Sequence, residues 1–590
     1  MRRKGSAVHT SLAAFAGVAL ALGGALVAAA PAHAADVEVH TEADLADAID
    51  DAVADPAEPV TVQILSSFPL TTPLPPLTAG SLTINSPGGQ TISATSISSV
   101  GFEVSGDAAL AIDGLTFDFY ESGPIVTSSG TTADPASSPT VTLSGVYATA
   151  GAFDTAFEIA DTAFSMSTTT IHDSETGLAG IFSFGRPTLQ NVTVLDSAGC
   201  GIEVFLTDDA LLTADRLTIE RADCEALWVD AVDAASATIT NALISDNDSG
   251  IVIFNDSTGT IEVRDSTVTG SSAAEQLAIL AFAGTVRVTN STISGGLDTS
   301  FPTVSAMFED ATVVIEHSTL AGNTVSAAPV LGVSGCGCAG AGSFTLSHTI
   351  VAGNTGTSDL APDVFLDLDP SLSRTIEWSL IGTVDPADTA TLDAIAAGPG
   401  NLYDPSTPID PELDALALNG GVTPNHLPDA TSPVINAGDP AFVAPPATDQ
   451  RGSARISGGI VDIGSVEVHF TPSLVLSRTS TSVGEQVTVT GTGFPAATTF
   501  TMVLNSTPVT LGTATSNASG ALSFAFVVPT SVPAGAHTVT ATLAGNVVGS
   551  APLTVTGLPD TGSHASATTA IGVLLMLAGL VVIAFRRRRA

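Results

Sequence analysis

A short unit of alternating apolar and polar residues recurs along the chain from about residue 110 to 384. Each copy contains a short apolar strand pattern, a polar residue, a Ser/Thr-rich step, a turn and a second apolar strand. Equivalent polar positions are 24 to 31 residues apart, or 50 across two units, and they are Asn191, Asn241, Asp265, Asn290, His317 and His348. The clearest copies are LQNVTVLDSAGCGIEVF from Leu189, ITNALISDNDSGIVIFN from Ile239, VTNSTISGG from Val288, IEHSTLAGN from Ile315 and LSHTIVAGN from Leu346. An apolar period of two predicts strands and excludes helical repeats.

Strands this short cannot bury their own apolar side, so the units must stack on one another to form a continuous core. The pattern therefore predicts an all-β coil of parallel strands, and crossover handedness favours a right-handed one. Roughly eleven rungs, spaced by about 4.8 Å, would form a rod on the order of 50 Å long. Before the repeat, Thr41-Glu42-Ala43-Asp44 opens a helical pattern of Leu45, Ile49 and Val53. We expect this helix to cap the open edge of the first rung.

The repeat resembles right-handed parallel β-helix proteins of the pectin-lyase-like type. This resemblance implies a β-helix with an N-terminal cap over residues 35–414. His317 and His348 share the column of Asn290, so we expect them to be ladder or turn residues rather than metal ligands.

Residues 415–470 carry different motifs, including LALNGGVTPNHLPDATSPVINAGDP, then DQRG at 449–452 and DIGSVE at 462–467. They resemble the choice-of-anchor Q region that follows β-helix repeats in surface proteins. The resemblance implies architecture rather than chemistry, namely a C-terminal part of the β-helix. We expect Asp449, Arg451 and Asp462 to form a structural ion-pair and turn set rather than a site.

Residues 471–557 change pattern again, to alternating runs such as QVTVTGTGF, TFTMVLN and HTVTATL separated by Gly, Pro, Asn and Ser turns. This spacing predicts a small β-sandwich. It resembles the Ig-like modules that serve as stalks in front of wall anchors.

The C-terminal segment 558–590 has three parts in order: Leu558, Pro559, Asp560, Thr561 and Gly562, then an apolar run over 570–585, then four arginines at 586–589. This arrangement resembles the LPXTG wall-sorting signal. The apolar run is shorter than the roughly 20 residues of a permanent span, but it can hold the precursor in the bilayer with the arginines inside. The resemblance implies that a sortase cleaves after Thr561 and joins Thr561 to peptidoglycan.

The N-terminus is consistent with export. Arg2, Arg3 and Lys4 precede an apolar stretch over 12–30, and Ala32-His33-Ala34 has the small residues of a cleavage site, so 1–34 is a predicted signal peptide. The mature chain then runs from Ala35 to Thr561, on the outside of the cell wall.

Removing both ends takes away 7 of the 16 basic residues and none of the 59 acidic ones, so the formal net charge falls from −43 to −50. Such a chain is not suited to binding nucleic acid or anionic lipid, where Lys and Arg neutralise phosphates. Lys4 is its single lysine, so the mature chain has no amine for sortase-built polymerisation. We therefore expect a monomer rather than a pilus subunit.

Four cysteines enter an oxidising compartment, where pairing is expected. Cys200 and Cys224 lie one unit apart at nearly the same point of adjacent repeats. Stacked rungs would place their Cα atoms about 5 Å apart, within disulfide range. Cys336 and Cys338 lie in GCGCAGAG, where glycine makes a strained one-residue loop feasible, and a metal or redox role is the alternative.

Aspartates recur after the apolar strands: Asp209, Asp233, Asp256 and Asp310. Three roles fit them. Asp tolerates turn conformations, carboxylate pairs perform glycoside hydrolysis, and oxygen ligands bind Ca²⁺. The 2 Trp and 3 Tyr against 24 Phe do not favour a polysaccharide groove, and we find no HExxH, P-loop, Cys-x-x-Cys or GxSxG motif.

These observations predict a wall-anchored surface protein that binds a ligand through the β-helix face, with a glycan or a host or matrix protein as the partner. The alternative from another class is a wall-bound polysaccharide lyase or glycoside hydrolase. A third possibility is a passive wall-coat component.

Overall fold

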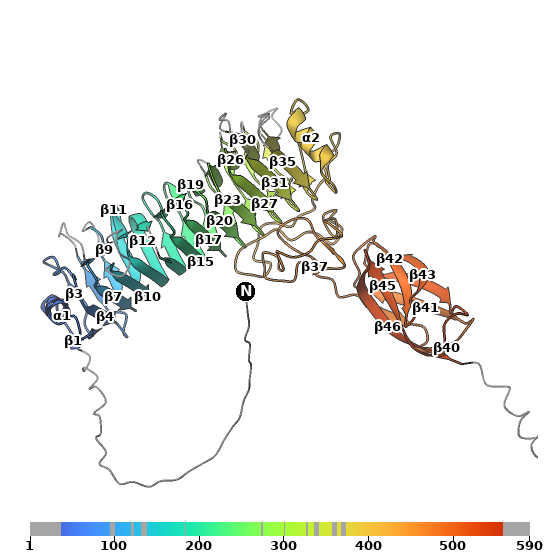
Figure 1. Ribbon diagram of the computed structural model, residues 1–590, viewed down its shortest axis with the longest axis horizontal. Coiled ribbons are helices and arrows are strands. Elements are labelled where there is room, and N and C mark those ends of the chain that lie inside the picture. The colour runs from blue at the N-terminus through green and yellow to red at the C-terminus, as the bar shows by residue number, and fades with distance from the viewer. Residues whose placement is uncertain are drawn as a thin grey trace, which may run out of the picture.

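The computed structural model describes residues 37–557, apart from gaps at 95–100, 120–122, 131–137, 183–184, 273–274, 300, 326–327, 336–341, 357–362 and 367–372. The predicted signal peptide, the sorting signal with Thr561, and Cys336 and Cys338 lie outside the described residues. The predicted all-β class is confirmed, because the chain is an elongated parallel coil of strands followed by a sandwich (Figure 1).

The coil has three parallel ladders, which we name faces A, B and C. Face A comprises β1 (Val37–Val39), β2 (Val60–Ile64), β4 (Ser81–Asn85), β7 (Ala109–Asp113), β10 (Thr140–Ser144), the start of β12 (Ala163–Phe182), the starts of β13 (Thr188–Leu195) and β15 (Leu211–Glu220), then β17 (Ser236–Thr240), β20 (Thr260–Arg264), β23 (Thr285–Thr289), β27 (Thr312–Glu316), β31 (Ser343–Ser347) and β35 (Ser373–Glu377).

Faces B and C follow face A in every full turn. Face B comprises β3 (Phe68–Pro69), β5 (Thr91–Ser93), β8 (Thr116–Asp118), the start of β11 (Tyr147–Ala160), the middle of β12, the ends of β13 and β15, then β18 (Leu243–Ser245), β21 (Thr267–Thr269), β24 (Thr292–Ser294), β28 (Thr319–Ala321), β32 (Ile350–Val351) and β36 (Leu380–Ile381). Face C comprises β6 (Phe102–Ser105), β9 (Val126–Ser129), the ends of β11 and β12, then β14 (Ile202–Leu206), β16 (Glu225–Asp233), β19 (Ser249–Ser257), β22 (Leu277–Ala281), β26 (Val304–Phe308), β30 (Leu331–Gly335) and β34 (Val364–Leu366). A short extra ladder joins β25 (Leu297–Thr299), β29 (Thr324–Val325) and β33 (Thr355–Gly356).

The core consists of inward columns that run along the coil. On face A, Val62, Ile84, Ile112, Leu143 and Met166 are in register and all are buried. Alternate residues of each strand point outward, as the apolar period of two predicts. Fourteen described strands stack on face A, more than the eleven rungs expected, because the rungs begin at residue 37, well before the recognisable repeat.

Helices close both ends of the coil. Helix α1 (Glu42–Ala54) starts at a capping box in which the Thr41 side chain accepts from the Asp44 N–H, and it buries Leu45 and Ile49. The predicted N-terminal helix is thus confirmed. Helix α2 (Thr389–Ala397) packs against β34 and β35 at the other end. Both helices cover ladder edges that would otherwise expose unpaired backbone groups.

The turn between faces A and B has a left-handed backbone in many rungs. The repeat positions identified in the sequence have positive φ: Asn191 (55°), Asn241 (56°), Asp265 (55°), Asn290 (51°), His317 (47°) and His348 (49°). Asn and Asp tolerate this region better than other residues with side chains. The His317 and His348 rings stack with centroids 4.5 Å apart, which confirms that they are ladder residues.

Residues 415–470, all of them described, add no rung to faces A, B or C; this part instead packs across face B. Asn290 Nδ2 donates to the Thr448 carbonyl (2.8 Å), and the Gly464 N–H donates to the His348 carbonyl (2.7 Å). Its strands are β37 (Ile456–Ser457) and β38 (Ile460–Val461), which pair antiparallel. Its many Pro and Gly residues leave no long alternating run that could form a further rung.

Residues 473–556 form two packed sheets. One is β39 (Ser473–Leu476), β41 (Gln486–Thr492) and β44 (Leu522–Val527); the other is β40 (Ser480–Ser482), β46 (Asn546–Thr556), β45 (Gly535–Leu543), β42 (Thr499–Asn505) and β43 (Val509–Thr515). Val487, Phe500 and Val539 are central to their shared core. A sandwich at this place was predicted from the alternating runs.

Candidate functional site

The outward side of face C carries two columns of side chains in strict register. One column contains Glu203, Trp228, Val252, Ala278, Ser305, Gly332 and Phe365, and the other contains Phe205, Asp230, Phe254, Leu280, Met307 and Ser334. Carboxylates occur in the rungs of β14 and β16, and apolar side chains dominate from β19 to β34. This face therefore joins an acidic part to an apolar part.

An apolar groove lies on the second part of these columns, with a volume of about 420 Å³. Its floor comes from β22, β26, β30 and β34, and Phe301, Pro302 and Pro329 from the neighbouring loops also line it. Phe301, Met307 and Phe365 are 54%, 42% and 47% exposed. Exposed apolar side chains gathered in one hollow are typical of a binding site rather than of ordinary surface.

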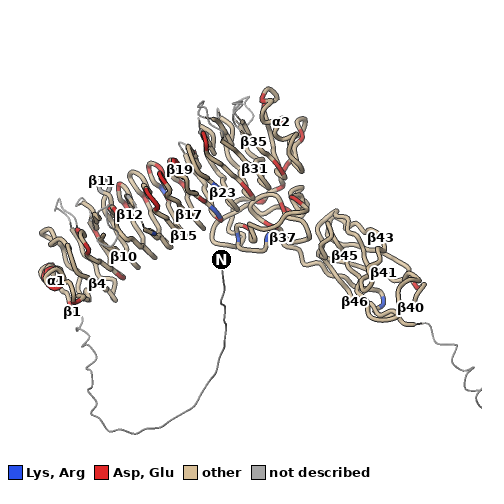
Figure 2. Tube along the Cα trace, viewed as in Figure 1, with Lys and Arg blue, Asp and Glu red and all other residues tan. Residues whose placement is uncertain are grey.

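The acidic part of face C lies beside this groove along the coil. Burial raises the pKa of Glu203, and the nearby charges of Glu225 and Glu175 raise it further. Burial also raises the pKa of Asp230, as does the charge of Asp256. Asp230 Oδ1 and Trp228 Nε1 are buried and have no hydrogen-bond partner within the described part of the chain. Figure 2 shows Asp and Glu at many positions along the β-helix and Lys and Arg at few.

The predicted aspartates are placed at separate points. Asp209 lies in an exposed turn after β14, where it lines a hollow of about 250 Å³ together with Arg186. Asp233 ends β16 with a left-handed backbone (φ 60°), as a turn aspartate does. Asp256 lies within β19, not after it, and Asp310 lies in an exposed bend before β27. Among the described residues, these carboxylates form no group of three at metal-ligand distance.

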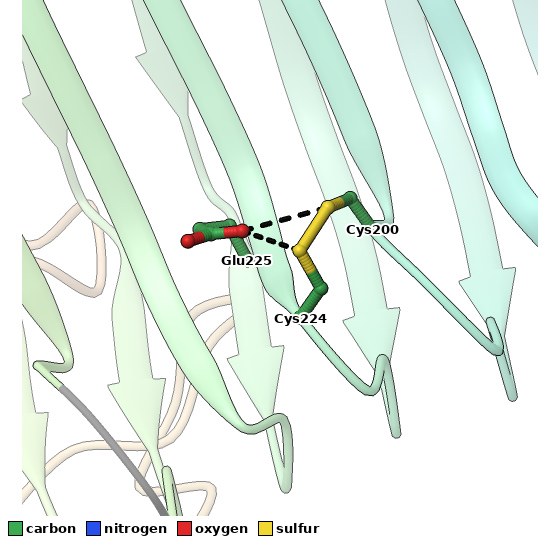
Figure 3. The surroundings of a disulfide bond; sticks show 3 residues. All are labelled: Cys200, Cys224 and Glu225. Carbon is green, nitrogen blue, oxygen red and sulfur yellow. Dashed lines mark hydrogen bonds between the residues drawn. A yellow bond between two sulfur atoms is a disulfide. The ribbon is translucent and has the colours of Figure 1, made fainter.

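Cys200 and Cys224 are joined by a disulfide across neighbouring rungs, with their Cα atoms 4.7 Å apart (Figure 3). The Glu225 carboxylate lies against this disulfide: Glu225 Oε2 is 3.5 Å from Cys200 Sγ and also contacts Cys224 Sγ. All three residues are half-buried, so solvent reaches them.

The DQRG and DIGSVE motifs form the buried side of the segment that covers face B. Asp449 pairs with Arg451 (2.8 Å) and also accepts from the Ser453 and Glu467 N–H groups. Asp462 accepts from the Asn436 and Val468 N–H groups (2.6 and 2.7 Å). The predicted ion pair between Asp449 and Arg451 is present, whereas Asp462 bonds to backbone N–H groups rather than to an arginine.

Arg455 is a central residue that sequence reasoning missed. Its side chain is 1% exposed, and it donates to the Gly464 carbonyl (3.0 Å) and to Asn290 on the β-helix. Glu467 is buried near Arg455. Burial raises the pKa of Glu467 and the Asp462 charge raises it further, while the Arg455 charge lowers it. A lone arginine in a loop is usually exposed, so its residue type gave no signal of burial.

A larger hollow of about 670 Å³ lies between face A and residues 445–448. Its wall contains the Arg287–Glu316 pair (2.6 Å), and Arg264 pairs with Asp265 (3.1 Å) beside it. These charges already have partners within the protein, whereas the apolar groove on face C leaves large apolar side chains such as Met307 and Phe365 exposed to solvent.

Two comparisons with known families agree with this architecture. Residues 100–293 match the right-handed β-helix region, and residues 554–590 match the LPXTG cell wall anchor motif. The protein is anchored to the Gram-positive cell wall. This wall-anchored protein is therefore secreted, and the motif implies processing by a sortase and covalent attachment to peptidoglycan. No curated protein matches the chain. Among its described residues, no helix is both long and apolar enough to cross a membrane.

Proposed function

We propose that this protein displays the outward side of face C as a binding surface for a polypeptide that carries apolar and basic side chains. The observation that supports this most is the apolar groove, with Phe301, Met307 and Phe365 exposed in it. The groove spans four rungs, or roughly 14 Å along the coil, which is enough for several side chains of an extended segment.

Charge complementarity favours a basic partner. Glu275 lies at the groove, and Glu203 and Asp230 lie on the same face a few rungs away. Attraction from the carboxylates a few rungs away is largely screened at physiological salt, so Glu275 at the groove itself contributes most, and such attraction raises the rate of encounter more than the final affinity. In this proposal, residues 415–470, which resemble choice-of-anchor Q regions, stiffen face B, and the sandwich acts as an Ig-like stalk.

The test uses the mature chain, residues 35–561, and a fluorescent model peptide of alternating leucine and lysine, with a leucine–glutamate peptide for comparison. We expect the basic peptide to bind, and Met307→Arg to weaken binding about tenfold or more by filling the groove and repelling the peptide. Tyr147→Arg is the matched control, because Tyr147 is 44% exposed, similar to the 42% of Met307, but lies outside the groove. Equal binding of both peptides, or equal losses in both variants, would contradict the proposal.

One observation favours a second candidate, a glycan-cleaving enzyme. Trp228 lies between Glu203 and Asp230 on face C, and both of these carboxyls have a raised pKa, as a general acid requires. This activity is measured as the release of new reducing ends from a panel of glycans. Turnover that is abolished in Asp230→Asn would support this candidate, and absence of turnover in the unmodified chain would remove it.

A further inference from the structure

Two cysteine sulfurs and one carboxylate, a ligand set that Zn²⁺ accepts, meet where β14 and β16 begin. The ligand atoms of Cys200, Cys224 and Glu225 all lie within 4.8 Å of one another, and within the described residues no other group of three His, Cys, Asp or Glu side chains does so. Figure 3 shows the carboxylate of Glu225 directed at both sulfur atoms.

The β-helix fixes the backbone under all three residues. The Gly201 N–H donates to the Glu225 carbonyl (3.0 Å), and the Asp223 N–H donates to the Ser197 carbonyl (3.0 Å). These bonds hold the two cysteines on adjacent rungs whether or not their sulfur atoms are bonded. A pair of thiolates can therefore remain close together after the disulfide has been reduced.

The surroundings carry negative charge that the protein does not balance. The charges of Glu225 and Glu175 both repel the Glu203 carboxylate, and none of the three forms an ion pair with another described residue. A divalent cation at this point would lower that repulsion.

We propose that reduction of the Cys200–Cys224 disulfide converts this place into a binding site for a thiophilic divalent cation such as Zn²⁺, with Cys200, Cys224 and Glu225 as ligands. A thiol reductant supplies two electrons and two protons, becomes a disulfide itself, and leaves two protein thiols. Each thiol then loses its proton to solvent as its sulfur binds the metal. Two sulfurs and one carboxylate oxygen occupy three tetrahedral positions, and water takes the fourth.

The site would make the connection between these rungs depend on redox conditions. Outside the cell the disulfide is the resting state, and the half-buried sulfurs are open to attack by a thiol. After reduction, the cation replaces the covalent link between the two side chains, while the backbone ladder keeps β14 and β16 paired. This inference does not depend on the function of the apolar groove.

Co²⁺ is the probe, because cobalt–thiolate bonds absorb strongly in the near ultraviolet. The experiment uses the mature chain with Cys336→Ser and Cys338→Ser, so that the second cysteine pair cannot bind the probe. We expect a thiolate-to-cobalt band after reduction with a phosphine and none in the oxidised protein. Adding Cys200→Ser should abolish the band, and Glu225→Gln should weaken Co²⁺ binding about tenfold or more.

Glu275→Gln is the matched control, because Glu275 occupies the same register position as Glu225 two rungs further along, about 10 Å along the coil and outside ligand distance. Its effect on Co²⁺ affinity should be less than twofold. A missing band in the reduced protein, a band that survives Cys200→Ser, or equal effects of the two Glu→Gln changes would overturn the proposal. Loss of the β-sheet circular dichroism on reduction would also overturn it, since the backbone would then not hold the ligands together.

Discussion

His348 lies in a buried stack of rings between the β-helix and the segment that covers face B. Its ring stacks on His317 and Trp378 and contacts Phe442. Nε2 accepts from the Asp439 N–H (3.0 Å), so Nδ1 carries the proton and donates to Ser347 Oγ (2.8 Å). Burial, followed by the positive charge of Arg455, lowers the pKa of His348 to about 4, and the Asp439 carboxylate opposes this only in part.

The low pKa of His348 predicts acid sensitivity. An unfolded histidine titrates near pH 6.5, so its neutral form stabilises the fold above pH 6.5, and this stabilisation is lost as the pH falls from 6.5 to about 4. The loss in free energy of unfolding is about 3 kcal/mol, and it levels off below pH 4.

The measurement is urea unfolding at several pH values between 4 and 8. Unfolding is monitored by the fluorescence of Trp228 and Trp378, which both lie in the β-helix. His348→Gln should reduce the slope of stability against pH in this window by close to one proton. His40→Gln, at an exposed position near α1, should leave the slope as it is. An unchanged slope in His348→Gln would show that other groups cause the acid sensitivity.

At the scale of elements, the left-handed turn between faces A and B sets the bend of each rung. Asn191 has φ 55° and an exposed side chain, so substitution there tests the backbone rather than packing. Asn191→Val should lower the free energy of unfolding by about 1–2 kcal/mol, because a β-branched residue is strained in this region. Asn191→Gly is the control and should change stability by only about 0.5 kcal/mol. Equal effects of valine and glycine would mean that the turn does not need this conformation.

The sequence predicts the repeating elements well, because each repeat contains its own apolar alternation, its own turn residue and its own inward-pointing core residues. Helix α1 was predictable from Thr41, Asp44 and the spacing of Leu45 and Ile49. The position of residues 415–470 was not, because their bonds to the β-helix join partners far apart in the sequence, such as Ser294 and His426, which are 132 residues apart. Arg455 was missed for the same reason, since its burial depends on that packing.

In the candidate site too, features that follow from the repeat could be predicted, and features that depend on loops could not. The pairing of Cys200 with Cys224 follows from one repeat length, whereas the apolar groove combines side chains from four rungs with Phe301, Pro302 and Pro329 from loops. Loops vary in length between rungs and carry no period, so the sequence gives no register for them. The aspartate column was visible in the sequence, but small offsets between units place Asp209, Asp233 and Asp256 at different points of the rung.

The whole molecule carries many carboxylates and a single lysine, Lys4, in the predicted signal peptide, and it is joined to the wall at its C-terminal end. The β-helix and the two-sheet sandwich precede the LPXTG motif, so both lie on the outer side of the attachment point. A net charge this far from zero generally favours repulsion between neighbouring copies. These properties are consistent with display of separate molecules rather than with a polymer.

Attachment through Thr561 predicts where the protein is found in the cell. Thr561→Ala changes the residue whose carbonyl a sortase would attack, so we expect the variant to remain in the membrane or appear in the medium, and to be reduced at least about tenfold in cell-wall digests. Asp560→Ala is the matched control, because the LPXTG motif accepts any residue at this position, and it should be retained in the wall at the level of the unmodified protein. Immunoblots of wall, membrane and medium fractions provide the measurement. Wall retention of Thr561→Ala would show that the chain is held by a different linkage, and loss of both variants would indicate a failure of export rather than of sorting.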